Sequence, residues 1–148
     1  MLHRYERILV ANDGSKNSQI AFDHAVATAI RNDAKLYILR VVDTRIDPFA
    51  PYIIEGSMEK ELEKARVELS ELVIKANNLG VKEAIPLLEE GAARTIIATQ
   101  IPDQEEIDLL IIGATGKTGL DKLMIGSTTN YVVNHAKCPV LVIRPDMT

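Results

Sequence analysis

The chain has 148 residues, of which 47% are hydrophobic and 26% charged, so residues 1–148 are expected to form a single domain with a substantial buried core. The net charge of −4, without a basic stripe interleaved with aromatic residues, argues against a nucleic-acid-binding surface. No apolar run approaches membrane-spanning length, the N-terminus has no apolar signal region, and one cysteine permits no internal disulfide. Together these features predict a cytoplasmic protein.

Strand-like and helix-like segments alternate along the chain. Ser15 suits the N-cap of the first helix, Gly80 suits the C-terminal cap of the second, and Pro86 indicates that the third strand lies at a sheet edge. In chain order, we expect a strand over 7–12, a helix over 16–31, a strand over 35–42, a helix over 57–79, a strand over 81–88, a helix over 91–99, a strand over 109–112, a helix over 127–135 and a strand over 139–143.

Two connecting segments predict irregular structure. Residues 43–56 contain Pro48 and Pro51, which disfavour regular strand pairing, yet they also carry several large apolar side chains. We therefore expect a flap that packs on the domain or on a second subunit. Residues 102–106 predict a polar turn.

This alternation predicts an α/β protein with a parallel sheet covered by helices on both faces. Among the few arrangements that right-handed crossovers leave, we expect a flavodoxin-like, Rossmann-like, doubly wound five-stranded sheet in the order 3-2-1-4-5. In that order the connections change direction between the first and fourth strands, and ligands bind outside the carboxyl ends at such a point. Asp13 closes the first strand and Gly113 the fourth, so two distant stretches indicate one crevice.

The stretch after the fourth strand has the features of a phosphate cradle. Gly113 ends the strand abruptly, a glycine-rich loop follows, and Gly126-Ser127-Thr128 opens a helix. Glycine lets the main chain approach an anion closely, and the first amides of a helix have no internal partners. The hydroxyls of Ser127 and Thr128 add donors at the same place.

Two common nucleotide motifs do not match. Gly116-Lys117-Thr118 supplies the second half of a Walker A loop, but Ile111 stands where its first glycine belongs. The dinucleotide pattern Gly-x-Gly-x-x-Gly is also absent after the first strand, where the sequence at 12–15 is Asn-Asp-Gly-Ser.

The spacing that is present over 113–127 is glycine, two residues, glycine, nine residues, glycine and serine. It resembles the nucleotide-binding motif of the universal stress protein family, in its ATP-binding branch. The resemblance covers nearly the whole chain, from 7–15 to 138–145. One departure is Ala92-Ala93, which stands where the family often has Asp and Pro; this segment follows the third strand and bears little on nucleotide binding.

The resemblance implies that the chain binds ATP and responds to stress as a regulatory protein. AMP or a cyclic nucleotide is an alternative ligand, and a divalent ion such as Mg²⁺ or Mn²⁺ could bridge Asp13 and the phosphates. By similarity, Asp13 would hydrogen-bond the ribose hydroxyls and Val41 would offer backbone groups to the adenine. The other implied contacts are with Gly113, Gly116, Gly126 and Ser127, which would hold the phosphates, with Thr128 near them, and with Ile112 and Thr115, which would touch the nucleotide.

The last strand predicts a homodimer. Family members of this type pair their last strands, and Val140–Ile143 would form a wholly apolar edge without charged protection, the kind of edge that attracts a partner strand. The alternative is that residues 43–56 of the same chain cover this edge.

Several of these residues also have simpler interpretations. The glycines could be only turn formers, although a long loop between two of them is typical of a functional segment. Asp13 could serve an Asp-Gly turn rather than a ribose, and Lys117 and Lys122 could be solvated rather than paired with phosphates. His3, His24 and His135 lack a metal-ligand spacing, and Cys138 is expected to be packed rather than catalytic.

No catalytic set emerges from the sequence, because no nucleophile or carboxylate pair is placed to activate water at a phosphate. We therefore favour a nucleotide-dependent switch over an enzyme. Two alternatives stay open: a slow ATPase or phosphotransferase, and a nucleotide-free dimeric interaction module.

Overall fold

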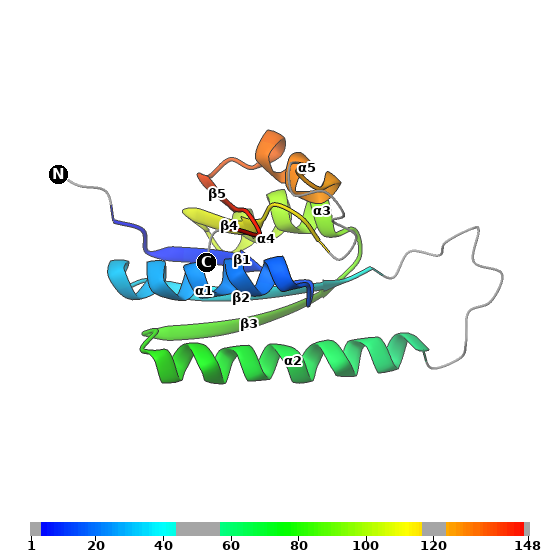
Figure 1. Ribbon diagram of the computed structural model, residues 1–148, viewed down its shortest axis with the longest axis horizontal. Helices are drawn as coiled ribbons and strands as arrows, with labels where there is room; N and C mark the ends of the chain where they lie inside the picture. Colours follow the sequence, from blue (N-terminus) through cyan, green and yellow to red (C-terminus); the bar gives the residue numbers. More distant parts are fainter. Residues whose placement is uncertain (1–3, 44–56, 117–123, 147–148) are drawn as a thin grey trace.

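Five parallel strands lie in the order β3-β2-β1-β4-β5 in the computed structural model, which describes residues 4–43, 57–116 and 124–146 (Figure 1). This confirms the predicted order. The elements are β1 (Arg7–Ala11), α1 (Lys16–Asn32), β2 (Lys35–Val42), α2 (Ser57–Leu79), β3 (Glu83–Glu90), α3 (Ala93–Thr95), the π-helical turn η1 (Ile96–Gln100), α4 (Ile101–Gln104), β4 (Leu109–Gly113), α5 (Ser127–His135) and β5 (Val140–Ile143).

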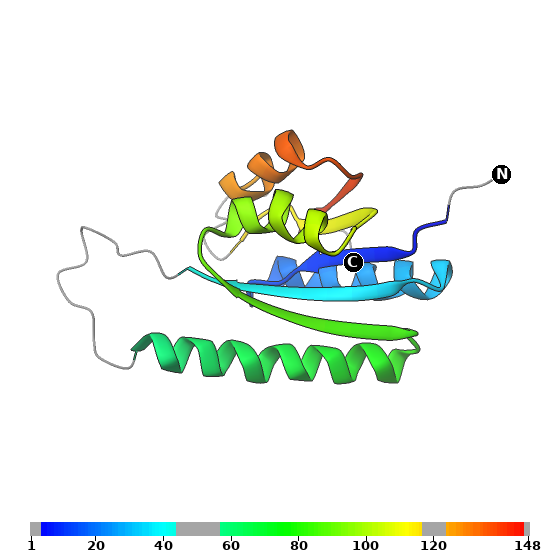
Figure 2. The same ribbon diagram turned by 180° about the vertical axis from the view of Figure 1, so that it is seen from behind.

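Helices cover both faces of the sheet. α1 and α2 pack on one face, and the run from α3 to α4 packs with α5 on the other (Figures 1 and 2). Successive strand residues point to opposite faces. In β1, for example, Ile8 and Val10 join the core under α1 while Leu9 joins the core under α5, and all three are fully buried. A strand buried on both sides explains why it is a continuous apolar run.

β1 and β4 are neighbouring inner strands of the sheet, and they run parallel with their carboxyl ends at nearly the same level. Ile8 pairs with Leu109 and Val10 with Ile111, both in parallel register. The chain continues from β1 into α1 on one face, whereas β4 leads toward α5 on the other. Their carboxyl ends therefore diverge and leave a crevice between them, as the strand order requires.

Local sequence signals set the helix ends. The hydroxyl of Ser15 accepts a hydrogen bond from the Ser18 amide at 3.1 Å, which is an N-cap for α1. At the other end Asp33 takes the left-handed conformation, and its amide bonds back to the last turn. α2 spans the predicted residues and ends at Leu79, and Gly80 follows it with φ +111°.

The helix after β3 differs from the prediction. Helical structure does not stop at Thr99 but continues through Gln104, so Pro102 lies inside the first turn of α4 rather than in a polar turn. The reason is the π-helical turn before it, in which the Ile101 amide bonds to the Ile96 carbonyl five residues back. A wider turn accommodates a proline that cannot donate an α-helical hydrogen bond.

Smaller differences lie at strand ends. β3 begins two residues later than expected and extends to Glu90, while its edge position agrees with the prediction from Pro86. The predicted flap over 43–56, apart from Asp43, lies outside the described residues, and so do Lys117 and Lys122. Within the described parts of the chain, no helix is long and apolar enough to span a bilayer.

Candidate functional site

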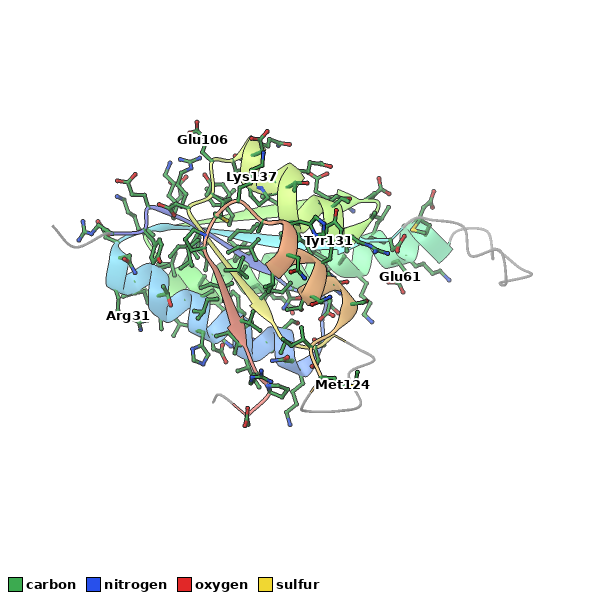
Figure 3. The ribbon with its side chains drawn as sticks, turned by 90° about the horizontal axis from the view of Figure 1, so that it is seen from above. Arg31, Glu61, Glu106, Met124, Tyr131 and Lys137 are labelled. Atoms are coloured by element: carbon green, nitrogen blue, oxygen red, sulfur yellow. The ribbon has the colours of Figure 1, made fainter. Side chains whose placement is uncertain are left out.

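A cavity of about 290 Å³ opens where β1 and β4 end. Its volume is close to the lower end of the range for small-molecule sites. In Figure 3, Met124 marks the chain two residues before the cavity-lining Gly126, and Arg31 marks the last turn of α1. All nine residues proposed from the sequence line this cavity: Asp13, Val41, Ile112, Gly113, Thr115, Gly116, Gly126, Ser127 and Thr128.

Two polar residues after β1 form one wall. Oδ1 of Asp13 accepts a hydrogen bond from the Ser15 amide at 2.9 Å, so the carboxylate does serve the turn. Its other oxygen keeps acceptor capacity. Asn12 is buried beneath, where its Nδ2 donates to the Ser18 hydroxyl at 3.2 Å. The turn interpretation and the ligand interpretation of Asp13 are therefore compatible.

The glycine loop comes very close to this wall. A Cβ atom placed on Gly116 would lie 2.8 Å from Oδ2 of Asp13. Real Cβ atoms do not approach an oxygen so closely, so a side chain at this position would displace the Asp13 carboxylate, whereas glycine lets the two lie close together. Asp13 is also the only charged side chain among the described lining residues. The carboxylate suits hydroxyl groups of a ligand, and the glycine loop that faces it suits an anion.

The exit of β4 is held from both faces. The Gly113 carbonyl accepts a hydrogen bond from the buried Thr129 hydroxyl at 2.7 Å. On the other side, a Cβ on Gly113 would lie 3.1 Å from both Cγ and Oδ1 of Asn17. The amide of Ala114 continues the sheet by donating to the Ile143 carbonyl at 2.8 Å. The strand end thus has little room to move.

The start of α5 presents amides to the cavity. Gly126 occupies the N-cap position in an extended conformation, and it provides no side-chain cap. Its own amide donates to the Ala114 carbonyl at 2.7 Å, which ties the helix start to the glycine loop. The first intrahelical bond is that of the Asn130 amide to the Gly126 carbonyl, so the amides of Ser127, Thr128 and Thr129 precede it. This is the arrangement in which a helix terminus binds an anion.

An apolar wall completes the cavity on the side of β2 and η1. Val41 and Ile112 were proposed from the sequence, whereas Leu39, Ala93 and Ile97 were not. Nothing local in the sequence showed that Ile97, in the η1 turn, lines the cavity. An apolar wall opposite a polar end suits a ligand with an aromatic base.

A buried ion pair supports the β1 wall from below. Arg40 on β2 is 7% exposed, and its guanidinium donates to Oε2 of Glu68 on α2 at 2.7 Å and to Oδ1 of Asn12 at 3.0 Å. Oδ1 of Asn12 also accepts from the Gly14 amide at 3.1 Å. Gly14 has φ +83°, and a Cβ there would lie 3.1 Å from the guanidinium. Arg40 thus packs under the turn that carries Asp13, a support that the sequence did not reveal.

The described lining combines apolar side chains with hydroxyl groups, one carboxamide and one carboxylate. The described lining residues include no histidine, cysteine, lysine or glutamate. Within the described residues, no group of three or more His, Cys, Asp or Glu side chains could hold a metal ion. His135 lies elsewhere, stacked on the Tyr131 ring at 3.9 Å between centroids.

A second cavity, of about 400 Å³, lies at the opposite, amino end of the sheet beside Cys138. Burial raises the pKa of the Cys138 thiol above its ordinary value, because the charged thiolate loses solvation. The thiol is therefore poorly ionised near neutral pH and is a weak nucleophile, in line with the expectation of a packed cysteine.

The sheet order and the first cavity define a doubly wound α/β protein with a ligand-sized pocket at its topological switch point. The model of the universal stress protein family matches residues 4–144. A putative universal stress protein of Staphylococcus aureus strain USA300 is 35% identical over 144 residues, which cover 96% of this chain and 86% of the relative. The chain belongs to the universal stress protein family.

Solved structures agree with this assignment. The universal stress protein UspA from Lactobacillus plantarum matches with a TM-score of 0.86 and 32% identity, covering 97% of this chain and 100% of that chain. A universal stress protein solved in complex with cAMP matches with a TM-score of 0.75 and 22% identity over 97% of this chain and 100% of that chain. At that identity the second likeness shows the shared fold.

Proposed function

We propose that this protein, over its whole length of 148 residues, is an ATP-binding regulatory domain of the cytoplasm. The observation that carries the proposal is the meeting of Asp13, the glycine loop and the first amides of α5 around one cavity. In this arrangement the apolar wall holds the adenine, Asp13 the ribose hydroxyls, and the Gly126 end the phosphates. The relative solved with cAMP binds a nucleotide, which supports the same class of ligand here.

The regulatory part of the proposal follows from where the ligand would sit. A nucleotide that bridges the β1 wall and the start of α5 contacts the Gly113–Gly116 loop and the N-terminus of the helix together. Binding would therefore link the Gly113–Gly116 loop to the start of α5, and a partner that recognises their nucleotide-bound arrangement would respond to the nucleotide. AMP or a cyclic nucleotide would occupy less of the phosphate end. Mg²⁺ or Mn²⁺ could join Asp13 to the phosphates.

Calorimetric titration tests the proposal. We expect ATP to bind the folded protein with one site per chain. Its melting temperature should rise with the logarithm of ligand concentration above Kd, since a ligand that binds only the folded state stabilises it. Adenosine should bind more weakly because it leaves the phosphate end empty. Titrations with AMP, cAMP and ATP, each with and without Mg²⁺, rank the ligands. If no nucleotide produced a saturable heat, the remaining hypothesis would be the nucleotide-free dimeric interaction module.

The same sample tests for enzymatic activity. A slow ATPase would release phosphate over many turnovers, with a rate proportional to protein concentration. We expect turnover to be very slow or absent, because the one carboxylate of the described lining, Asp13, is assigned to the ribose rather than to a water at the phosphates.

We propose that a second copy of the chain pairs with β5. This strand is the last in the sheet, pairs with β4 along one side, and carries Leu141 with 38% of its surface exposed. Val133 on the neighbouring α5 is 48% exposed. An apolar edge strand of this kind recruits a partner strand.

Substituting Leu141 with lysine should therefore yield a monomer. A lysine on the edge strand would place a charge beside the partner strand and oppose pairing, while an exposed position costs the folded monomer little stability. Sedimentation equilibrium would show a dimer for the natural chain and a monomer for Leu141→Lys. An exposed residue far from β5, Val67 on α2, provides the matched control: Val67→Lys should stay dimeric. A natural chain that sediments as a monomer would contradict this proposal without affecting nucleotide binding.

A further inference from the structure

We propose that Asn17 is a positioning residue for the phosphate end of the cavity. Asn17 is 5% exposed and is absent from the cavity lining, so it does not touch the ligand itself. It lies in the first turn of α1, far in sequence from the loop it contacts. This inference rests on the proposed nucleotide binding and concerns which residue gives the glycine loop its place.

The contacts of Asn17 join three separate segments. Its Oδ1 accepts hydrogen bonds from the Thr115 amide at 2.9 Å and from the Thr115 hydroxyl at 3.1 Å. Its Nδ2 donates to the Ile143 carbonyl at the end of β5 at 3.0 Å. The first two contacts hold the loop immediately before Gly116. The third anchors the same side chain to the sheet.

Both halves of the amide are needed for this role. A carboxamide donates through one end and accepts through the other, whereas a carboxylate only accepts and a hydroxyl is too short to reach both partners. Asn17 also packs directly against Gly113, whose missing Cβ makes room for it. The side chain thus sits between the strand end and the loop, and its polar ends fix the direction in which the loop leaves.

The Thr115 contacts have a consequence for the ligand. The amide and the hydroxyl of Thr115 both donate to Asn17, so neither is directed to a phosphate. Thr115 instead keeps the backbone fixed, so that Gly116 faces Asp13 at close range. A site whose donors must stay within about half an ångström of their productive positions needs such support. Without Asn17 the loop would lose its anchor while the apolar wall and Asp13 would stay in place.

This separation predicts a selective effect. Asn17→Ala should weaken ATP binding about 10- to 100-fold, equivalent to losing one hydrogen bond to a charged group. Adenosine lacks phosphates and does not depend on the loop that Asn17 holds, so its affinity should change less than about twofold. Stability should fall only modestly, because the Ile143 carbonyl still accepts from the Ala114 amide. The ratio of the ATP and adenosine affinities is therefore the readout, and a purely structural residue would leave it unchanged.

Asn32, at the other end of the same helix, provides a matched control. Its Oδ1 accepts from the Tyr5 amide at 3.1 Å and its Nδ2 donates to the Thr28 carbonyl at 2.9 Å, so it also uses both ends of its carboxamide. Asn32→Ala should lower the melting temperature while leaving both affinities unchanged. Amide exchange at Thr115 in the ligand-free protein should accelerate in Asn17→Ala and not in Asn32→Ala.

The outcomes separate the two proposals. If the natural chain binds ATP and Asn17→Ala binds both ligands as well as the natural chain does, the positioning role is wrong while the proposed function stands. Equal losses for ATP and adenosine also overturn the positioning role. If the folded natural chain binds no nucleotide, the proposed function fails, and unchanged Thr115 exchange in Asn17→Ala would refute the anchoring as well.

Discussion

Gly126→Asp is expected to fold normally and to lose at least about 100-fold in ATP affinity, the largest effect on binding that a single substitution should have here. The new carboxylate would stand at the N-cap of α5, beside the amides proposed to hold the phosphates. Two unit charges of the same sign repel by ~4 kcal/mol at 4 Å when the effective dielectric constant is about 20. The carboxylate would also occupy the amides itself.

The fold should accept this change. Gly126 has φ −64° and ψ 159°, a conformation open to any residue, and a Cβ there would lie 3.5 Å from the nearest atom, the Ala114 carbonyl oxygen. Aspartate is among the preferred N-cap residues, and replacing glycine by it gains a few tenths of a kcal/mol or about 1 kcal/mol at most. We therefore expect an unchanged or slightly higher melting temperature in the absence of ligand, measured by calorimetry.

Two further substitutions at the same position separate charge from bulk. Gly126→Ala adds only a methyl group, and Gly126→Asn adds the shape of aspartate without its charge. The alanine variant should lose the least affinity for ATP, the asparagine variant more and the aspartate variant the most. In all three variants, the affinity for adenosine should change less than the affinity for ATP. An aspartate variant that is folded and binds ATP within about threefold of the natural chain would contradict the assignment of the phosphates to this helix end, since the expected repulsion is far larger.

Glu68→Gln should produce the largest loss of stability among the polar substitutions considered, about 2 kcal/mol. The Arg40 side chain is 9% exposed, and Glu68 supplies its only carboxylate partner among the ion pairs of the described residues. Removing that charge leaves a buried guanidinium without compensation. Glu68 itself is 34% exposed, so water moderates the cost and places it below the 3–5 kcal/mol of fully buried pairs. For a domain of this size, thermal melts should show a decrease of about 4–8 °C.

A second ion pair on the same helix isolates burial as the cause. Glu63 accepts from Arg66 at the same 2.7 Å, but its side chain is 64% exposed. Glu63→Gln should change the free energy of unfolding by less than about 1 kcal/mol, as is usual for surface pairs. Equal effects of the two substitutions would show that the buried pair contributes no more than a surface one.

Most of the fold could be predicted because its signals are local. The apolar runs that became β1 and β4, the Ser15 cap and the amphipathic pattern of α2 each lie within one short segment. Pro102 misled the prediction, since a proline normally ends a helix in its interior. The π-helical turn that accommodates this proline has no simple sequence signal. Its position is set by tertiary packing, because Ile97 and Ile101 are buried in the core.

The candidate site divides in the same way. The glycine spacing and the Asp13 turn lie in two continuous stretches, and resemblance to a known motif made them visible. Asn17, Arg40 and Ile97 act on the site from α1, β2 and η1, each through contacts with residues distant in sequence. In the sequence, Asn17 is only one polar residue of a helix and Arg40 only one charge in an apolar strand, so neither residue could be recognised there as a support of the site.

The sequence by itself determined the α/β class and the positions of the strands and of the glycine loop, because hydrophobic periodicity and glycine spacing act over short stretches of chain. The strand order was predicted with the crossover rule, and most residues around the switch point were predicted from the resemblance to a known motif. Only the tertiary structure decided what supports those residues. The guanidinium beneath the Asp13 turn and the carboxamide behind Thr115 acquire their partners when the sheet brings β1, β2, β4 and β5 together. Hydrogen bonds between residues far apart in the chain depend on that register, which no local pattern encodes.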